Sequence, residues 1–370
     1  MIKKYLRKIH LWLGLIVGLL VFIIAITGCL YAFQEEIQNY TDEYRYSKIE
    51  QKPILLPSAI KQIAETELPN KVLHSIKYYK DNHSVEVSFY HYKPTYYYKM
   101  FLNPYTGKVL HTQNMDEGFF SWVLKGHMYL WLPQKIGSVV VLVSTLIFFG
   151  MVVTGFILWF PKNWNVFKKR IWFQWKDTTK WKRKNWDLHG IIGFYSCAFA
   201  LIFIITGLVW VLPNFAELFH SALGGKKSMV YQEAVSLKSN SKLKNPLDSL
   251  YQFYNQNTDF ASIELHPAET DSSSILVVTN PSNQTYWKSN YIFHDQYNLQ
   301  DLKVNHIWSK YNEATNADKI LRLNYDIHVG SALGLTGKII AFLTSLLIAT
   351  LPITGFMIWY GRKKKTTANN

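Results

Sequence analysis

Cysteine is scarce in this chain, and both cysteines stand in apolar surroundings. The 370 residues include only Cys29 and Cys197, and each lies within a long run of uncharged residues. A disulfide framework of the kind that holds small secreted domains together is therefore excluded. No nucleotide-binding or flavin-binding motif occurs either, so the sequence predicts no flavin or nucleotide site in this chain.

Charge is almost missing from four stretches of the sequence, residues 11–33, 137–160, 190–213 and 336–360. The one charge inside them is Lys338, which stands near an end, where its side chain can reach the membrane interface. A helix of about 20 apolar residues spans a hydrocarbon core of roughly 30 Å. The sequence therefore predicts a mainly α membrane protein with a bundle of four transmembrane helices.

The net charge of +15 is confined to segments outside the apolar runs. Residues 1–9, 161–188 and the tail after 360 hold four, nine and four Lys/Arg, with Asp177 and Asp187 as the acids among them. Lys/Arg accumulate in cytoplasmic loops, so both termini and the 161–188 loop are predicted to be cytoplasmic. Because the positive charge lies beside the membrane, lipid is the expected partner and no nucleic acid is needed to explain the net charge.

The start of the chain permits a second interpretation. Basic residues, an apolar run and "ITGC" at 26–29 resemble a lipoprotein signal that would be cleaved before Cys29. The same Thr-Gly pair recurs in the other three runs, where no cysteine follows it. The first run is therefore expected to remain as an anchor.

An internal repeat becomes visible when the runs are aligned by these Thr-Gly pairs. His10 precedes Thr27 by 17 residues, and His189 precedes Thr206 by the same 17. His127 and His328 precede the pairs of the second and fourth runs by 27 and 26 residues. Such register between the two halves predicts an internal duplication with a boundary near residue 175.

The segments between the runs have mixed composition and repeat more faintly. Helix patterns at 56–67 and 245–256 precede strand-like runs at 84–90 and 274–280, and 101–110 has the pattern of two strands around a turn. Two small α+β domains outside the membrane are predicted. The expected division is 1–34 for helix 1 and the N-terminus, 35–120 for the first outer domain, 121–160 for a short outer helix and helix 2, 161–188 for the basic loop, 189–213 for helix 3, 214–326 for the second outer domain and 327–370 for helix 4 and the tail.

The predicted topology sorts the histidines into two pairs, His10 with His189 at the cytoplasmic face and His127 with His328 at the outer face. A histidine at membrane depth needs a partner. Neutral imidazoles from two helices can ligate a haem iron axially. The sequence therefore predicts two b-type haems with these four residues as the metal ligands.

Two glycines support this cofactor prediction. Gly14 and Gly193 each stand four residues after a histidine, where a missing side chain would let a macrocycle approach the backbone. Basic residues at the inner face are expected to neutralise its acidic groups; they are Lys3, Lys4, Arg7, Arg183 and Lys184.

Three alternatives to this site remain open. Each histidine could be an interfacial group that hydrogen-bonds to backbone or headgroups. Zinc fits less well, because it gathers three or four ligands and the helices offer two histidines per face. A continuous helix from His127 to Thr154 would extend about 40 Å, so a break near Pro133 is expected. The outer haem could then use other histidines outside the membrane, which are His111, His220, His294 and His306.

These residues resemble the family of PepSY-associated transmembrane helix proteins, described as iron-regulated inner-membrane proteins. The resemblance rests on "RKIHLWLGLIVG", "TGFILWFPK", "DLHGIIGFY", "IHVGSALGLTGK" and "ITGFMIWYGR", which together cover nearly the whole chain. The turn "NPYTGKV" at 103–109 resembles that of a PepSY domain, whereas "FHDQYNLQDLKV" at 293–304 departs from it. By motif, the helix-start histidines of the family fall on His10, His127, His189 and His328.

The resemblance implies a bacterial inner-membrane reductase that passes electrons outward to a ferric siderophore in iron uptake. Some relatives are fused to a flavoprotein module, which has no counterpart here, so a separate cytoplasmic reductase or quinol would be the electron donor. The alternative is a non-enzymatic membrane anchor with PepSY-like domains that bind a peptide or partner protein. Transport is the weakest reading, because the runs carry no intramembrane carboxylate.

Overall fold

The computed structural model describes residues 2–239 and 243–367. The chain divides into two compact units, each assembled from segments that are distant in the sequence. The helix unit takes the residues up to Gln34, Trp122–Ala216 and the residues from Ile327 onward, and the sheet unit takes Glu35–Ser121 and Glu217–Asp326.

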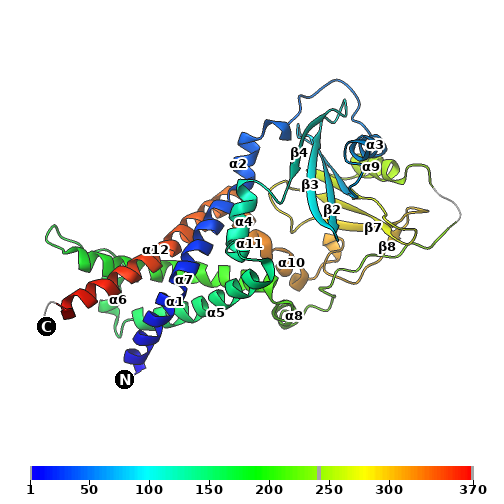
Figure 1. Cartoon of the computed structure of the whole chain (residues 1–370). Coiled ribbons are helices and arrows are strands. Elements are labelled where there is room, and N and C mark those ends of the chain that lie inside the picture. The colour runs from blue at the N-terminus through cyan, green and yellow to red at the C-terminus, as the bar shows by residue number, and fades with distance from the viewer. Residues whose placement is uncertain (1, 240–242, 368–370) are drawn as a thin grey trace. The chain divides into compact units, whose positions relative to one another are not determined.

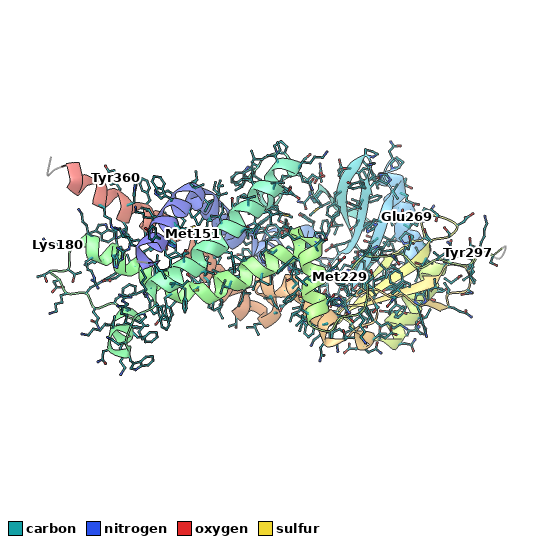
Figure 2. The ribbon with its side chains drawn as sticks, turned by 90° about the horizontal axis from the view of Figure 1, so that it is seen from below. Met151, Lys180, Met229, Glu269, Tyr297 and Tyr360 are labelled. Atoms are coloured by element: carbon teal, nitrogen blue, oxygen red, sulfur yellow. The ribbon has the colours of Figure 1, made fainter. Side chains whose placement is uncertain are left out.

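Four long helices form the helix unit, and each is long and apolar enough to cross a membrane. They are α1 (Ile2–Tyr31), α5 (Gln134–Trp159), α7 (Trp181–Val211) and α12 (Gly334–Thr367). Each packs beside two others in the cyclic order α1, α5, α7, α12, so α1 and α7 lie diagonally opposite (Figure 1). The predicted four-helix arrangement is confirmed. The bundle end that carries the N-terminus, Lys180 and Tyr360 is called the terminal end (Figure 2).

Short helices connect the long ones. They are α4 (Phe119–Tyr129), α6 (Trp164–Arg170), α8 (Pro213–Ala222), α11 (Asn324–Val329) and the 3-10 turn η3 (Ser331–Leu333). The expected break before Pro133 is confirmed, because Leu130 and Trp131 adopt positive φ angles of 53° and 57° between α4 and α5. A matching break stands between α11 and α12 at Gly330, whose φ is 86° and where a Cβ would lie 2.4 Å from a backbone oxygen.

The sheet unit is built on one antiparallel sheet of eight strands in the order β4-β3-β2-β1-β5-β6-β7-β8. The strands are β1 (Leu73–Tyr79), β2 (Val85–Tyr92), β3 (Thr95–Leu102), β4 (Val109–Asn114), β5 (Ser262–His266), β6 (Ser274–Asn280), β7 (Asn290–Asp295) and β8 (Asp301–Leu302). The helical elements are α2 (Gln34–Thr41), η1 (Glu43–Arg45), α3 (Pro57–Glu67), α9 (Pro246–Asn257), η2 (Tyr311–Glu313) and α10 (Asn316–Arg322). The expected helices and strands of both segments are therefore present.

The two segments predicted as separate domains share this sheet. Strand β1 pairs with β5 at its centre, with Ile76 opposite Leu265. Both residues are fully buried in the core that α3 and α9 cover, and Figure 1 shows these two helices side by side. Asp248 at the start of α9 accepts hydrogen bonds from the backbone N–H and hydroxyl of Ser58 in α3, at 2.7 and 2.6 Å. The physical reason for the union is that pairing with β5 satisfies the backbone groups of an otherwise open β1 edge.

The opposite face of the sheet carries a row of alternating charges on its central strands, and a small apolar cluster that includes Leu276 and Phe293 at β6 and β7. The carboxylate of Glu86 on β2 lies 2.9 Å from the ammonium of Lys99 on β3 and accepts a hydrogen bond from the Tyr79 hydroxyl at 2.7 Å. Lys77 on β1 stands opposite both Glu86 and Glu264. Burial would raise the pKa of Glu86, but the charges of Lys99 and Lys77 and the bonds from Tyr79 and Lys99 outweigh it and lower that pKa to about 2.

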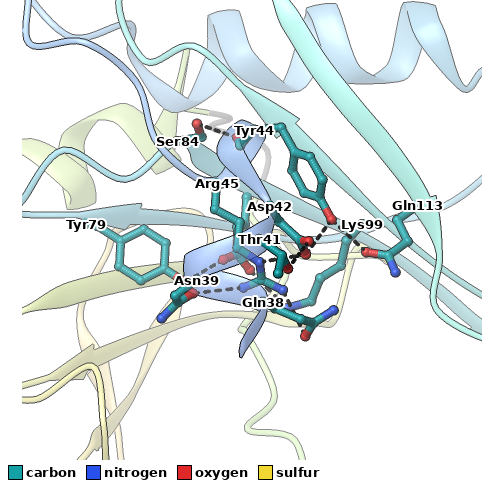
Figure 3. Close-up of polar contacts among 11 residues, drawn as sticks. Gln38, Asn39, Thr41, Asp42, Tyr44, Arg45, Tyr79, Ser84, Lys99 and Gln113 are labelled. Carbon is teal, nitrogen blue, oxygen red and sulfur yellow. Dashed lines mark hydrogen bonds and ion pairs between the residues drawn. The ribbon is translucent and has the colours of Figure 1, made fainter. Parts of the chain in front are cut away.

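The segment after α2 is fastened to the same sheet by polar contacts, drawn in Figure 3. The Tyr44 hydroxyl lies 3.4 Å from the side-chain oxygen of Gln113 on β4, and the Ser84 hydroxyl beside β2 donates to the Tyr44 carbonyl at 2.8 Å. Within the segment, Tyr44 also donates to Asp42 at 2.8 Å, and Arg45 donates to the side-chain oxygen of Gln38 at 3.2 Å. Burial, together with the neighbouring carboxylate of Asp42, raises the pKa of Tyr44 to about 12.

Candidate functional site

Two histidines predicted to pair at one face meet inside the helix unit near the terminal end. His10 on α1 and His189 on α7 come from diagonally opposite helices, and their ring centroids lie 6.4 Å apart. The ring planes are inclined by 79°. The identical spacing of the two histidines from their Thr-Gly pairs places them at the same depth of the bundle.

The second predicted pair also meets, and it does so on the short helices. His127 on α4 and His328 on α11 have ring centroids 6.2 Å apart and ring planes inclined by 68°. The breaks that end α4 and α11 turn the chain before the next long helix begins. They explain how His127 and His328 can face each other although they stand 27 and 26 residues before the Thr-Gly pairs of their long helices.

Each of the four imidazoles is held through its Nδ1 atom. A threonine hydroxyl holds three of them: Thr154 for His10 at 3.0 Å, Thr354 for His189 at 2.9 Å and Thr206 for His328 at 2.8 Å. The backbone oxygen of Ile24, one turn before Thr27, holds His127 at 2.8 Å. Every histidine therefore rests on the Thr-Gly region of another helix.

These contacts favour one tautomer for each ring. When the Thr154 hydroxyl donates its hydrogen to the Gly150 carbonyl at 2.8 Å, it accepts from the Nδ1–H of the histidine. Thr354 and Thr206 do the same toward Thr350 and Ile202. A carbonyl is always an acceptor, so the partner of His127 imposes the same rule. All four rings thus donate from Nδ1 and keep an unprotonated Nε2, the form in which a neutral imidazole binds a metal.

The glycine of each Thr-Gly pair makes room for a ring. A Cβ added to Gly155 or Gly355 would lie 3.1 or 3.2 Å from the Cε1 atom of His10 or His189. The corresponding distances are 2.8 Å for Gly28 beside His127 and 3.6 Å for Gly207 beside His328. We call each threonine or carbonyl with its glycine a Thr-Gly shelf. Each shelf forms a seat for one imidazole.

A cavity of about 1100 Å³ surrounds the first pair. His10, His189 and the two predicted glycines, Gly14 and Gly193, all line it. A Cβ on Gly14 would come within 3.1 Å of the Met151 methyl group, and one on Gly193 within 3.8 Å of a Leu351 methyl group. Both glycines therefore stand at the cavity wall, and their place beside a macrocycle stays a prediction. Its other walls are mostly apolar, as is usual for a site that takes a large organic group.

The family model for the PepSY-associated TM region matches residues 7–362 of this chain. The chain belongs to this family. The match confirms the resemblance drawn from the sequence motifs and, with four helices able to span a membrane, indicates a multi-pass membrane protein. A comparison with curated proteins found no match.

Basic residues line the cavity where it reaches the terminal end of the bundle. Lys3, Arg7 and Arg183 line it as predicted, and the sequence did not single out Lys169, Arg170 and Arg362, which line it too. Several cations are already engaged by the fold. Lys3 donates to the Phe160 carbonyl and Arg170 to that of Trp159, at 3.1 and 2.6 Å, which satisfies carbonyls at the end of α5.

The four histidines left open as alternative ligands lie in the sheet unit and have neighbours of their own. These are Tyr44 stacked on His111, Asp318 bonded to His220, Tyr254 bonded to His294 and Gln232 bonded to His306. Burial lowers the pKa of both His294 and His306. The geometry favours His127 and His328 as the second pair, because these two face each other and keep Nε2 unbonded to protein in the described part of the chain.

Replacing the shelf threonine should weaken the predicted metal site without removing a histidine. Thr154→Val deletes the acceptor for the Nδ1–H of His10, so the ring loses both its orientation and its fixed tautomer. We expect affinity for a group bound at Nε2 to fall by about 10- to 100-fold. Titration of the cofactor-free protein with haem measures this change, and Thr154→Ser, which restores a hydroxyl, is the matched control. Equal affinities for the Val and Ser variants would contradict the role of the shelf.

Proposed function

We propose that the chain is a haem b protein of the bacterial inner membrane that carries electrons from the cytoplasmic side to an extracytoplasmic acceptor. The observation that carries the proposal is the set of four histidines in two facing pairs, each with Nε2 available. The terminal end is assigned to the cytoplasm, because the Lys/Arg excess lies there. The sheet unit then lies outside.

The spacing of the rings supports an iron between them. A bond from a metal to an imidazole nitrogen is about 2 Å long and the ring centre lies about 1 Å further, so two axial imidazoles on one metal have centroids roughly 6 Å apart. The observed separations are 6.4 and 6.2 Å. A bound haem would supply reversible one-electron transfer.

The residues of the chain would perform three tasks around such a group. His10, His189, His127 and His328 bind the metal, and their Thr-Gly shelves fix the rings and raise their basicity. Apolar residues between the pairs exclude water; they include Val17, Val21, Ala200, Phe203 and Ile348. Arg7 and Arg183 supply positive charge for acidic substituents at the terminal end.

The proposed acceptor is a ferric siderophore, in line with iron uptake. One electron converts Fe(III) to Fe(II), a softer and less highly charged ion that hard oxygen ligands hold less tightly. Release then needs no cleavage of the chelator. The choice of a ferric siderophore rests on the family resemblance, and the geometry of the histidines does not bear on it.

We also propose that the two halves arose by duplication and that each contributes a PepSY-like module to the sheet. In both halves one helix precedes four strands, and the sheet order is symmetric about the pairing of β1 with β5. The structure of the turn in the first module agrees with its "NPYTG" sequence. The Asn103 side chain accepts hydrogen bonds from the backbone N–H groups of Tyr105 and Thr106, and Gly107 has a φ of 70°.

An absorbance spectrum of the protein purified in mild detergent tests the haem proposal. We expect about two b-type haems per chain by pyridine haemochrome, with low-spin bands in the oxidised and dithionite-reduced states. A protein that is colourless and stays colourless when haem is supplied would overturn it. The histidines would then be interfacial anchors, and the sheet unit would have to carry a partner-binding function.

A further inference from the structure

The basic end of the cavity offers a surface for an electron donor. We define the basic mouth as the cavity-lining residues Arg7, Lys169, Trp172, Trp186 and Arg362. Trp172 and Trp186 are 69% and 48% exposed. Exposed tryptophan beside arginine and lysine is the composition of a protein-binding surface more than that of a solvated one.

Two cations of the basic mouth have no task in the fold. Among the side chains that the structure describes, those of Arg7 and Lys169 make no ion pair and no hydrogen bond. They differ in this from Lys3 and Arg170, which bind carbonyls at the end of α5. Their position on the cavity wall also separates them from cations that only reach outward to lipid headgroups.

The lining also bears on the chemistry of the donor. A hydroquinone gives up protons as it is oxidised, and a free base beside it speeds that step. Among the described cavity-lining residues the one carboxylate is Asp187, and it already accepts from Arg183 at 2.9 Å and from the Trp175 indole N–H at 3.3 Å. The histidines direct their remaining lone pairs to the proposed metal. The cavity is thus suited to receiving an electron without a proton.

We propose that the basic mouth docks an acidic one-electron carrier protein. This inference rests on the proposed function and names its electron donor by class. The carrier is oxidised by one electron, and the site between His10 and His189 is reduced by that electron. Positive charge at the mouth speeds encounter with an acidic partner, and the exposed tryptophans supply contact area after encounter.

Binding of a flavodoxin, an acidic one-electron flavoprotein, tests the docking directly. The full chain is placed in nanodiscs of neutral phosphatidylcholine, so that anionic lipid contributes nothing, and association with oxidised flavodoxin is recorded by biolayer interferometry. We expect the association rate to fall about tenfold or more as the salt concentration rises from about 20 to about 300 mM. Absence of binding at low salt would overturn the proposal.

Charge variants locate the surface. Lys169→Glu should slow association about tenfold further and Lys169→Ala less, whereas Lys108→Glu, the same change at an exposed position of the sheet unit, should leave it unaltered. Haem content and melting temperature establish that each variant is folded. Equal slowing by Lys169→Glu and Lys108→Glu would show that only net charge matters and would refute a docking surface at the mouth.

A kinetic comparison separates this inference from the proposed function. Reduction of the haem band by photoreduced flavodoxin should follow the same salt and Lys169 dependence as binding. A protein without haem would refute the proposed function, while binding would still be measured on it. A haem-bearing protein that menadiol reduces rapidly, and that flavodoxin neither binds nor reduces, would leave the proposed function standing and overturn the docking proposal.

Discussion

Replacing His10 or His189 with alanine is expected to halve the haem content of the purified protein. Each variant removes one of the two proposed ligands of one haem, and a single remaining imidazole is expected to hold haem poorly. The haem at the second pair should be retained, because His127 and His328 have their own shelves. Pyridine haemochrome and the amplitude of the low-spin bands measure the result.

Chemical rescue distinguishes a lost ligand from a damaged fold. In His10→Gly, free imidazole added to the buffer should occupy the space of the missing ring and restore the low-spin bands. His91→Ala in the sheet unit is the matched control and should keep the full haem content. A His10→Ala protein with unchanged spectrum would rule out His10 as a ligand.

Removal of the ammonium of Lys99 is expected to cause the largest loss of stability in the sheet unit. Lys99→Met leaves the Glu86 carboxylate, which is only 6% exposed, without its closest positive charge. Breaking such a buried pair costs about 3–5 kcal/mol, and the nearby Lys77 should hold the loss toward the lower end. The double variant with Glu86→Gln should recover part of it. Lys61→Met, which breaks the exposed pair with Glu65 at 3.7 Å, should cost about 0–1 kcal/mol.

The same pair fixes a pH dependence. The pKa of Glu86 is about 2 in the folded protein, against about 4.3 for an ordinary glutamate in an unfolded chain. The ionised Glu86 carboxylate therefore contributes fully to the free energy of unfolding above its ordinary pKa. This contribution is lost as the pH falls toward the pKa of Glu86 in the folded protein. Apparent melting temperatures of wild type and Glu86→Gln should differ most at neutral pH and converge at acid pH. A constant difference at every pH would show that the ion pair does not provide the stability.

The parts of the structure that the sequence predicted are those set by local patterns. Runs without charge predicted the four long helices, and equal spacing from Thr-Gly pairs predicted that His10 would face His189. The break near Pro133 followed from the length of a helix compared with a membrane. The haem itself and the boundaries between the segments remain predictions.

The parts that escaped prediction depend on which elements meet in space. The threonine shelves join residues of different helices, although the topology already put Thr154 and Thr354 at the same end as His10 and His189. The single sheet depends on the pairing of Ile76 with Leu265, and no local pattern specifies a partner strand that far along the chain. Lys169 looked like any other cation of a basic loop until its neighbours were known.

The central pairing of β1 with β5 also bears on how the protein is made. Strand β1 is synthesised early, and its partner follows roughly 180 residues later, which at about 5–20 residues per second is a delay of roughly 10 to 40 seconds. Until then the first half-sheet has a bare edge that another nascent copy or any extended segment can occupy. Biogenesis of this protein therefore has a vulnerable interval, and a holding chaperone that shields that edge would be most needed between the emergence of the first half and that of the second.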